Sequence, residues 1–152
     1  MPEVRSLVLI SLLTTIALAQ PESPGFRITL PDTTVTSGDT LSLPIRVNDL
    51  TGHNIISFEF SLSYPGTSLN YLGLETENTL SAGGTVMDNP NTEVDRMKVA
   101  GMFTAPLQGP GELLYLRFTT LQPDTVSLAP SGVLLNTFHV SEVDSGTISV
   151  IP

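Results

Sequence analysis

The stretch NIISFEFSLSYPG, residues 54–66, carries a large apolar side chain at every second position from Ile56 to Tyr64. The side chains between them are small or polar, namely Ser57, Glu59, Ser61 and Ser63. A period of two is typical of a β-strand that buries one face and exposes the other to water. The stretch therefore predicts a strand with an apolar inner row and an outer row of hydroxyl and carboxylate groups.

Alternation of this kind recurs along the chain and predicts further strands. The expected strands are Phe26–Leu30, Thr40–Val47, Ile55–Tyr64, Leu69–Leu74, Gly84–Met87, Arg96–Phe103, Gly111–Leu121, Asp124–Leu128, Gly132–Leu135 and Gly146–Ile151. Pro44 has no N–H for a sheet ladder, so its strand is expected to lie at an edge or to carry a bulge. No segment sustains a helical period, and segments rich in Gly, Pro, Asn and Ser separate the strands. The pattern predicts an all-β fold, an antiparallel β-sandwich of about nine strands.

The expected strands also indicate which side chains face outward. On the strand at 96–103 these are Arg96, Lys98, Ala100 and Met102, and on the strand at 111–121 they are Leu113, Tyr115 and Arg117. Exposed apolar and aromatic side chains beside a cation are typical of protein interfaces. Single apolar side chains are also ordinary on a solvated surface, so both interpretations stay open for each row.

Composition limits the class of protein. The chain has 152 residues, which suits one domain with a hydrophobic core. Its net charge is −9, so it offers no basic field for the phosphates of nucleic acid or anionic lipid. The chain contains no cysteine, which excludes disulfides, thiolate metal sites and cysteine nucleophiles.

The first residues resemble an export signal. Arg5 precedes the apolar run Leu7–Ala19, which ends in small residues that a signal peptidase accepts, so Gln20 is the expected new N-terminus. This run is shorter than the roughly 20 residues that a membrane-spanning helix needs. The expected organisation is a signal peptide at 1–19, a short linker at 20–25 and a β-sandwich domain at 26–152. We therefore expect a protein that is secreted or held in a bacterial cell envelope, with no membrane insertion after cleavage.

The order of motifs carries a family resemblance. The motifs are SGDTLSLPIRV, ISFEFSLSYPGTSLNYLG, RMKVAGMF, GPGELLYLRF and DSGTISV, in that order from about Thr33 to the end of the chain. Their order and spacing resemble those of the cohesin domain. One departure is plain, since the family usually has Asp-Pro after the tyrosine and this chain has Tyr64-Pro65-Gly66. The resemblance implies a nine-stranded jelly-roll sandwich that is not an enzyme and needs no cofactor.

The resemblance also implies a partner and a site. Cohesins bind the dockerin module of another protein, usually to assemble extracellular enzymes that degrade polysaccharide, and the calcium belongs to the dockerin. Glu59 matches the family's acidic contact, and Ser57 matches its polar neighbour. Ser61 lies in the same row, and Lys98, Ala100 and Met102 are placed beside it by analogy. A solvated face without a partner is the alternative for this row.

Two other classes of binding or structural protein stay open. A carbohydrate-binding module would bind polysaccharide directly, but such modules usually present planar aromatic side chains, and this chain has no tryptophan and three tyrosines. A purely structural spacer domain of the cell envelope is the third possibility.

Catalytic and metal sites find little support. His53 and His139 are not accompanied by a G-x-S-x-G or H-E-x-x-H motif. Glu75 and Glu77 are spaced like a carboxylate pair on an extended segment, but no aromatic residue stands beside them to hold a sugar. The segment 88–95 offers oxygen ligands without the order of a calcium-binding loop. The sequence therefore predicts neither an enzyme nor a metal protein.

Overall fold

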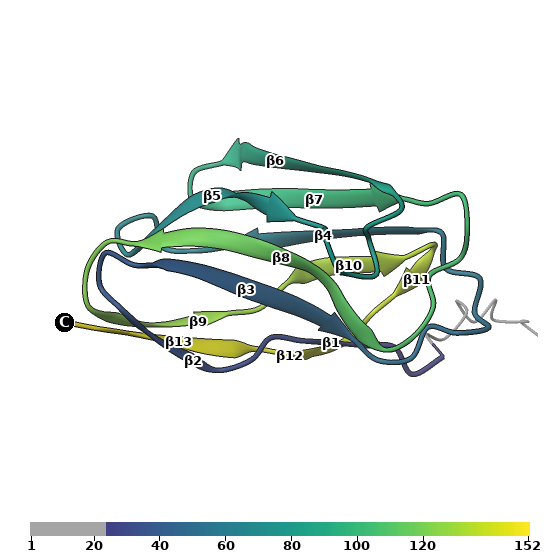
Figure 1. Cartoon of the computed structure of the whole chain (residues 1–152), viewed down its shortest axis with the longest axis horizontal. Helices are drawn as coiled ribbons and strands as arrows, with labels where there is room; N and C mark the ends of the chain where they lie inside the picture. The colour runs from purple at the N-terminus through teal and green to yellow at the C-terminus, as the bar shows by residue number, and fades with distance from the viewer. Residues whose placement is uncertain (1–23) are drawn as a thin grey trace, which may run out of the picture.

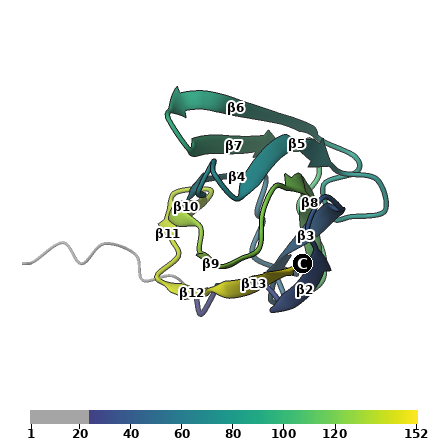
Figure 2. The ribbon, with the colours of Figure 1, turned by 90° about the vertical axis from the view of Figure 1, so that its left-hand side faces the viewer.

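The computed structural model describes residues 24–152, except for the side chains of residues 91–93. The expected signal peptide at 1–19 lies outside the described residues, as does the linker up to residue 23. The described residues contain strands, turns and loops and no helix, so the all-β prediction is confirmed. Thirteen strands form three sheets, and Figures 1 and 2 show these sheets surrounding one interior.

The strands of each sheet lie side by side in a fixed order. The first sheet consists of β12 (Glu142–Asp144), β1 (Arg27–Thr29), β3 (Thr40–Val47), β8 (Gly111–Thr120) and β5 (Leu69–Glu75). The second consists of β11 (Phe138–His139), β10 (Ser131–Leu135), β4 (Ser57–Ser63), β7 (Arg96–Met102) and β6 (Thr85–Glu93). The third consists of β2 (Thr33–Thr36), β13 (Gly146–Ile151) and β9 (Asp124–Leu128).

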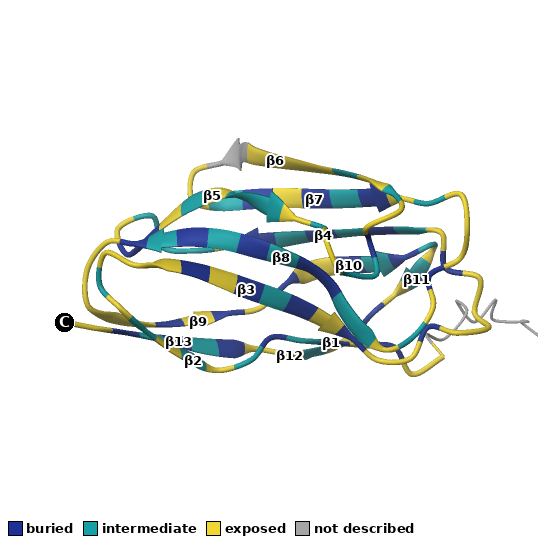
Figure 3. Ribbon diagram, viewed as in Figure 1, coloured by how far each residue is buried: buried dark blue, intermediate teal, exposed yellow. Residues whose placement is uncertain are grey.

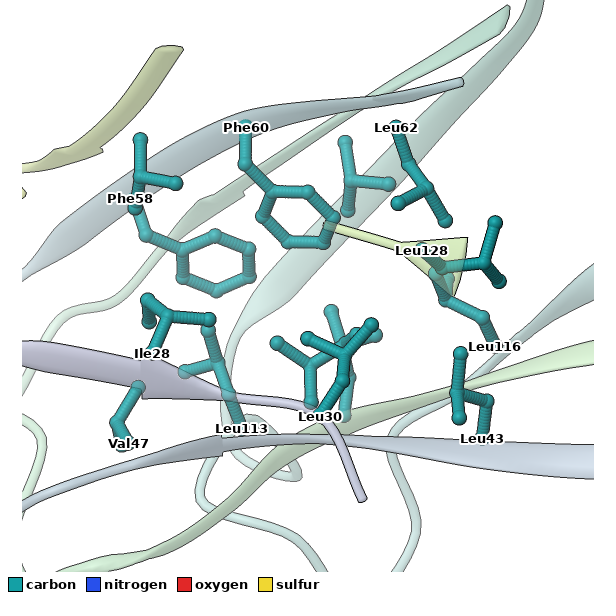
Figure 4. Close-up of a cluster of buried hydrophobic side chains, with 14 of the residues drawn as sticks. Ile28, Leu30, Leu43, Val47, Phe58, Phe60, Leu62, Leu113, Leu116 and Leu128 are labelled. Atoms are coloured by element: carbon teal, nitrogen blue, oxygen red, sulfur yellow. The ribbon is translucent and has the colours of Figure 1, made fainter. Parts of the chain in front are cut away.

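Strand β4 supplies one wall of the core. Phe58, Phe60 and Leu62 point from it toward the first sheet, as Figure 4 shows, and each is at most 3% exposed. Leu113 and Leu116 of β8 meet them from the other side (Figure 4). The period-two row that predicted the strand therefore forms part of the contact between the two large sheets.

The exposed Ile56 corrects the start of that row. It was expected inside, but it lies just before β4 and is 42% exposed, whereas Ile55 is fully buried. The backbone N–H of Ile56 donates to the side-chain oxygen of Asn136 at 2.9 Å instead of joining the strand ladder. The alternation of buried and exposed side chains is therefore out of phase until the regular strand begins at Ser57.

The paired ends of the chain correct the purely antiparallel prediction. Strand β1 pairs with β12 in parallel, and β2 pairs with β13 in parallel, at the same offset of 115 residues along the chain. The Asp32 side chain accepts a hydrogen bond from the N–H of Thr147 at 2.8 Å between the two paired segments. A side chain at Gly146 would lie 2.5 Å from the carbonyl oxygen of Pro31, so the close approach of the two segments needs glycine here.

The strand count also differs from the expected nine. The structure divides the described residues into thirteen strands: one in each of the ten segments expected from the sequence, and the short strands β2, β11 and β12 in segments expected to be turns or loops. Strand β2 is held by pairing with β13, and β11 by pairing with β10. The partner of β2 lies far away in the sequence, and β11 is only two residues long. Alternation of apolar and polar residues within such a segment is a weak signal for a strand.

Leu113 corrects the expected outer row of β8. It was expected to face outward, but it is 1% exposed, and its neighbour Leu114 is also buried. The pairing of β8 with β3 shifts register between Ile45 and Arg46, so Leu113 is the extra residue of a β-bulge. A bulge lets two successive side chains face the same way. The sequence had predicted an edge or a bulge at Pro44, and β1 pairs with β3 only beyond it, at Arg46 and Val47.

Candidate functional site

The outer surface of strands β4, β7 and β6 forms one face of the domain, which we call the candidate face. The three strands are paired side by side, and buried and less buried residues alternate along β4 and β7 (Figure 3). The rows of paired residues are Ser57–Met102–Thr85, Glu59–Ala100–Met87 and Ser61–Lys98–Asn89. Paired residues on neighbouring strands point to the same side, so each row is one continuous strip of surface.

All six site residues expected from the sequence lie on the candidate face. These are Ser57, Glu59, Ser61, Lys98, Ala100 and Met102. The inner residues of β7, namely Met97, Val99 and Gly101, are buried as expected. The structure therefore brings the six side chains together, and their role in binding stays a prediction.

One corner of the candidate face is apolar. Met102 is 70% exposed and Met87 is 65% exposed, and Ala100 lies between them in the register of β7 and β6. A hollow of about 360 Å³ adjoins Met102 and Ala100 on the β10 side. Its lining includes Ser57, Glu59, Ala100, Met102, Leu134 and Asn136. Exposed methionine beside a hollow is suited to apolar contact with another molecule, because its side chain is flexible and polarisable.

The charges on the candidate face largely compensate each other. A carboxylate oxygen of Glu59 lies 3.4 Å from the ammonium nitrogen of Lys98, with both side chains partly exposed. Such a pair adds little to stability because water screens it. It does leave the centre of the face close to neutral in a chain whose net charge is −9.

A comparison with models of known protein families finds one match. The family model described as "Cohesin domain" matches residues 26–150, which is most of the chain. The chain belongs to the cohesin family. This confirms the resemblance that the order of motifs indicated. A search of curated protein sequences finds no match.

Solved cohesin structures share the fold at low sequence identity. A non-cellulosomal cohesin from the archaeon Archaeoglobus fulgidus is 17% identical with a TM-score of 0.68, and the match covers 84% of this chain and 91% of that one. The cohesin module of a family 33 glycoside hydrolase from Clostridium perfringens is 15% identical with a TM-score of 0.69, covering 82% and 94%. A structure of a type I cohesin–dockerin complex from Clostridium thermocellum matches at 13% identity and a TM-score of 0.69, covering 88% and 99%.

The opposite outer face of the cohesin domain has a different character. Arg46 lies 3.5 Å from Glu112, and Arg117 lies 3.4 Å from Glu75, so ion pairs cross the outside of β3, β8 and β5. Leu113 was expected on this face but is buried in the bulge. Of the expected outer row of β8, only Tyr115 and Arg117 face outward. The candidate face is therefore the better placed of the two for apolar contact.

Asn136 supports the edge of the candidate face, and sequence reasoning missed it. Its side-chain oxygen accepts hydrogen bonds from the N–H groups of Ile56 and Ser57 at 2.9 and 3.2 Å. Its side-chain nitrogen donates to the carbonyl oxygen of Asn54 at 2.9 Å. The residue has a φ of 53°, which asparagine tolerates better than most residues. These bonds fix the chain where β4 begins.

A hydrogen bond ties the outer strand of the candidate face to the other large sheet. The Tyr71 hydroxyl on β5 donates to a carboxylate oxygen of Asp88 on β6 at 2.7 Å. Both strands are sheet edges, and they lie next to each other in Figures 1 and 2. Burial, followed by this hydrogen bond, raises the pKa of Tyr71 above its ordinary value of 10.0. Met87 is adjacent to Asp88, so the bond helps to hold the apolar corner in place.

We expect Tyr71→Phe to weaken the alkaline decline in stability. Above about pH 10 the unfolded chain releases the tyrosine proton while the folded domain retains it, so the free energy of unfolding falls as pH rises. Phenylalanine has no proton to lose. Urea titrations should show that the free energy of unfolding falls less between pH 7 and pH 11 in the variant than in the parent. At pH 7 the variant should be less stable than the parent by about 1 kcal/mol or less. Tyr115→Phe, on the outside of β8, is the matched control, and an equal flattening in both variants would contradict the assignment.

The remaining candidates from the sequence do not assemble into another site. The ring of His53 packs edge-on against Phe26 at 5.1 Å, and Glu75 is paired with Arg117. Among residues 24–152, no group of three or more His, Asp or Glu side chains could hold a metal ion. Within the same range, no helix is long and apolar enough to cross a membrane.

Proposed function

We propose that this cohesin domain is a non-catalytic binding module that captures a dockerin-type module on the candidate face. Some of its structural relatives were solved in complex with dockerins, among them the Clostridium thermocellum cohesin and a cohesin from Acetivibrio cellulolyticus bound to a Cel5 dockerin. The observation that carries the proposal is the gathering of the six expected residues on one face with an exposed apolar corner.

The chemistry of the candidate face suits a protein partner. Short serine hydroxyls lose little rotamer entropy when they are ordered, so Ser57 and Ser61 can accept or donate hydrogen bonds at low cost. Met87 and Met102 supply apolar area at the other corner. A partner with an apolar strip beside polar groups would complement both halves of the face.

We further propose that the domain works outside the cytoplasm. The resemblance of residues 1–19 to an export signal supports this proposal, and the partner would then be another secreted protein, such as an enzyme that acts on polysaccharide. In this proposal the calcium needed for binding belongs to the dockerin, and the cohesin domain itself needs no cofactor.

A pull-down experiment with the purified cohesin domain as bait tests the proposal. The purified cohesin domain is incubated with dockerin modules encoded in the same genome, once with calcium and once with a chelator. We expect capture of at least one dockerin that is lost when calcium is removed. No calcium-dependent capture of any of them would contradict the proposal. Retention of the domain on insoluble cellulose or chitin without a protein partner would favour direct binding of polysaccharide instead.

The tyrosines give polysaccharide binding little support in this structure. Tyr71 is half-buried and bonded to Asp88, and its ring packs near those of Tyr64 and Phe118. Tyr115 lies on the outside of β8. These rings do not form one exposed planar platform, which is the feature that polysaccharide-binding faces usually present.

We expect Glu59→Arg to weaken capture of a dockerin by about tenfold while leaving the melting temperature nearly unchanged. The change replaces the partner of Lys98 by a second cation on an exposed strand position, where stability depends little on the side chain. Isothermal titration and thermal melting measure the two effects. Glu75→Arg, which breaks a similar exposed pair on the opposite face, is the control. If both variants bind as the parent does, Glu59 is not in the contact.

A further inference from the structure

The three methionines in the described part of the chain divide into two kinds. Met87 and Met102 are 65% and 70% exposed, whereas Met97 is fully buried. The two exposed residues lie on neighbouring strands of the candidate face and stand diagonally across from each other, since Met87 pairs with Ala100 and Met102 pairs with Thr85. Diagonal neighbours in a sheet are within reach of each other when their side chains are long. Together they make up most of the exposed apolar corner.

The composition of the chain makes methionine the main target of oxidation. The whole sequence contains no cysteine and no tryptophan, so methionine is its most readily oxidised type of side chain. Solvent reaches the thioether sulfur of an exposed methionine, and the core shields that of Met97. A peroxide should therefore modify the candidate face and leave the interior intact.

We propose that Met87 and Met102 are oxidation sites through which a peroxide switches off partner binding. The thioether sulfur attacks one peroxide oxygen, the O–O bond breaks, methionine becomes methionine sulfoxide, and the peroxide is reduced to water or an alcohol. Each event turns a flexible apolar side chain into a polar one without cutting or crosslinking the chain. This inference rests on the proposed function, because it assigns a regulation to the same face.

The position of the two residues makes the modification effective. They flank Ala100, the small side chain in the middle row of the candidate face. A partner that packs on Ala100 must cover both methionines, and a sulfoxide there would have to give up its bound water. Because both side chains point away from the core, their oxidation should not disturb folding. Loss of binding with an unchanged fold is therefore the expected signature.

Mild hydrogen peroxide treatment of the purified full domain tests the proposal. Peptide mass spectrometry should show that Met87 and Met102 gain one oxygen each while Met97 stays unmodified. Thermal melting should be nearly unchanged. Titration with the dockerin captured in the pull-down should show affinity weakened by roughly tenfold or more after oxidation.

The double variant Met87→Leu with Met102→Leu is the matched control. Leucine keeps the apolar area and has no sulfur, so the affinity of this variant for the dockerin, measured before and after peroxide, should not change with the treatment. Unchanged affinity of the oxidised parent, with both sulfoxides confirmed, would overturn the inference and leave the proposed function standing. Equal loss of affinity in the oxidised leucine variant would also overturn it. Failure of the untreated parent to bind any dockerin would overturn the proposed function, and the switch with it.

Discussion

Replacing Phe60 by alanine should lower the free energy of unfolding by about 3–5 kcal/mol. Phe60 is 2% exposed and points from β4 into the space between the large sheets (Figure 4). Its ring stacks near that of Phe58, with centroids 6.2 Å apart. Removing the ring leaves a cavity in a region where both walls are rigid sheets, so the surroundings can relax only partly. Urea unfolding followed by circular dichroism measures the loss.

The matched control is the next residue on the same strand. Ser61 points to the candidate face, so Ser61→Ala should change the free energy of unfolding by no more than about 0.5 kcal/mol. The two variants test the period-two arrangement directly. A similar loss in both, or a loss below about 1 kcal/mol for Phe60→Ala, would mean that this strand does not divide its side chains between core and solvent.

The strands with regular alternation were predictable from the sequence. Thr40–Val47 and Asp124–Leu128 have the expected bounds, and β4, β7 and β8 differ from expectation by no more than two residues at either end. In each of them a buried apolar row alternates with a more exposed row, and this is the property that hydrophobic periodicity detects. The class of fold follows from many such strands without a helical segment.

Features that depend on pairing partners were not predictable in the same way. The bulge that buries Leu113 arises from the register between β8 and β3, which no single strand encodes. The parallel pairing of β2 with β13 brings together segments 115 residues apart, so the strand at 33–36 depends on a partner that the local sequence does not reveal. Strand β6 continues through Pro90, where the sequence DNPN favours a turn, because pairing with β7 resumes at Glu93.

The candidate site was predictable in its centre and missed at its margins. Alternation on β4 and β7 placed Glu59 and Ala100 outside, and the pairing of these two residues confirms that they share one face. Met87 was missed because its strand was expected to end there, although the alternation of Thr85, Met87 and Asn89 continues the outer row. The hydrogen bond between Asn136 and the start of β4 joins residues 80 positions apart, so the local sequence around either residue does not indicate it.

Replacing Ala100 by arginine should weaken dockerin capture by about 30-fold or more, which corresponds to about 2 kcal/mol. Ala100 pairs with Glu59 on one side and Met87 on the other, so it lies in the middle row of the candidate face. A long cation at this position would stand between the partner and the sheet, and the nearby Lys98 would add like charge. Buried residues at the centre of an interface carry most of its binding energy, and a block there removes the neighbouring contacts as well.

The effect should be confined to binding, because Ala100 points away from the core. Its neighbours Val99 and Gly101 face inward and are untouched by the change, so the melting temperature should move little. Asn70→Arg, at an exposed position on β5 in the other large sheet, adds the same charge and is the control. Isothermal titration with one captured dockerin separates the outcomes. Affinity that falls equally in both variants would indicate a general charge effect, and affinity that stays unchanged for Ala100→Arg would place the partner on another surface of the domain.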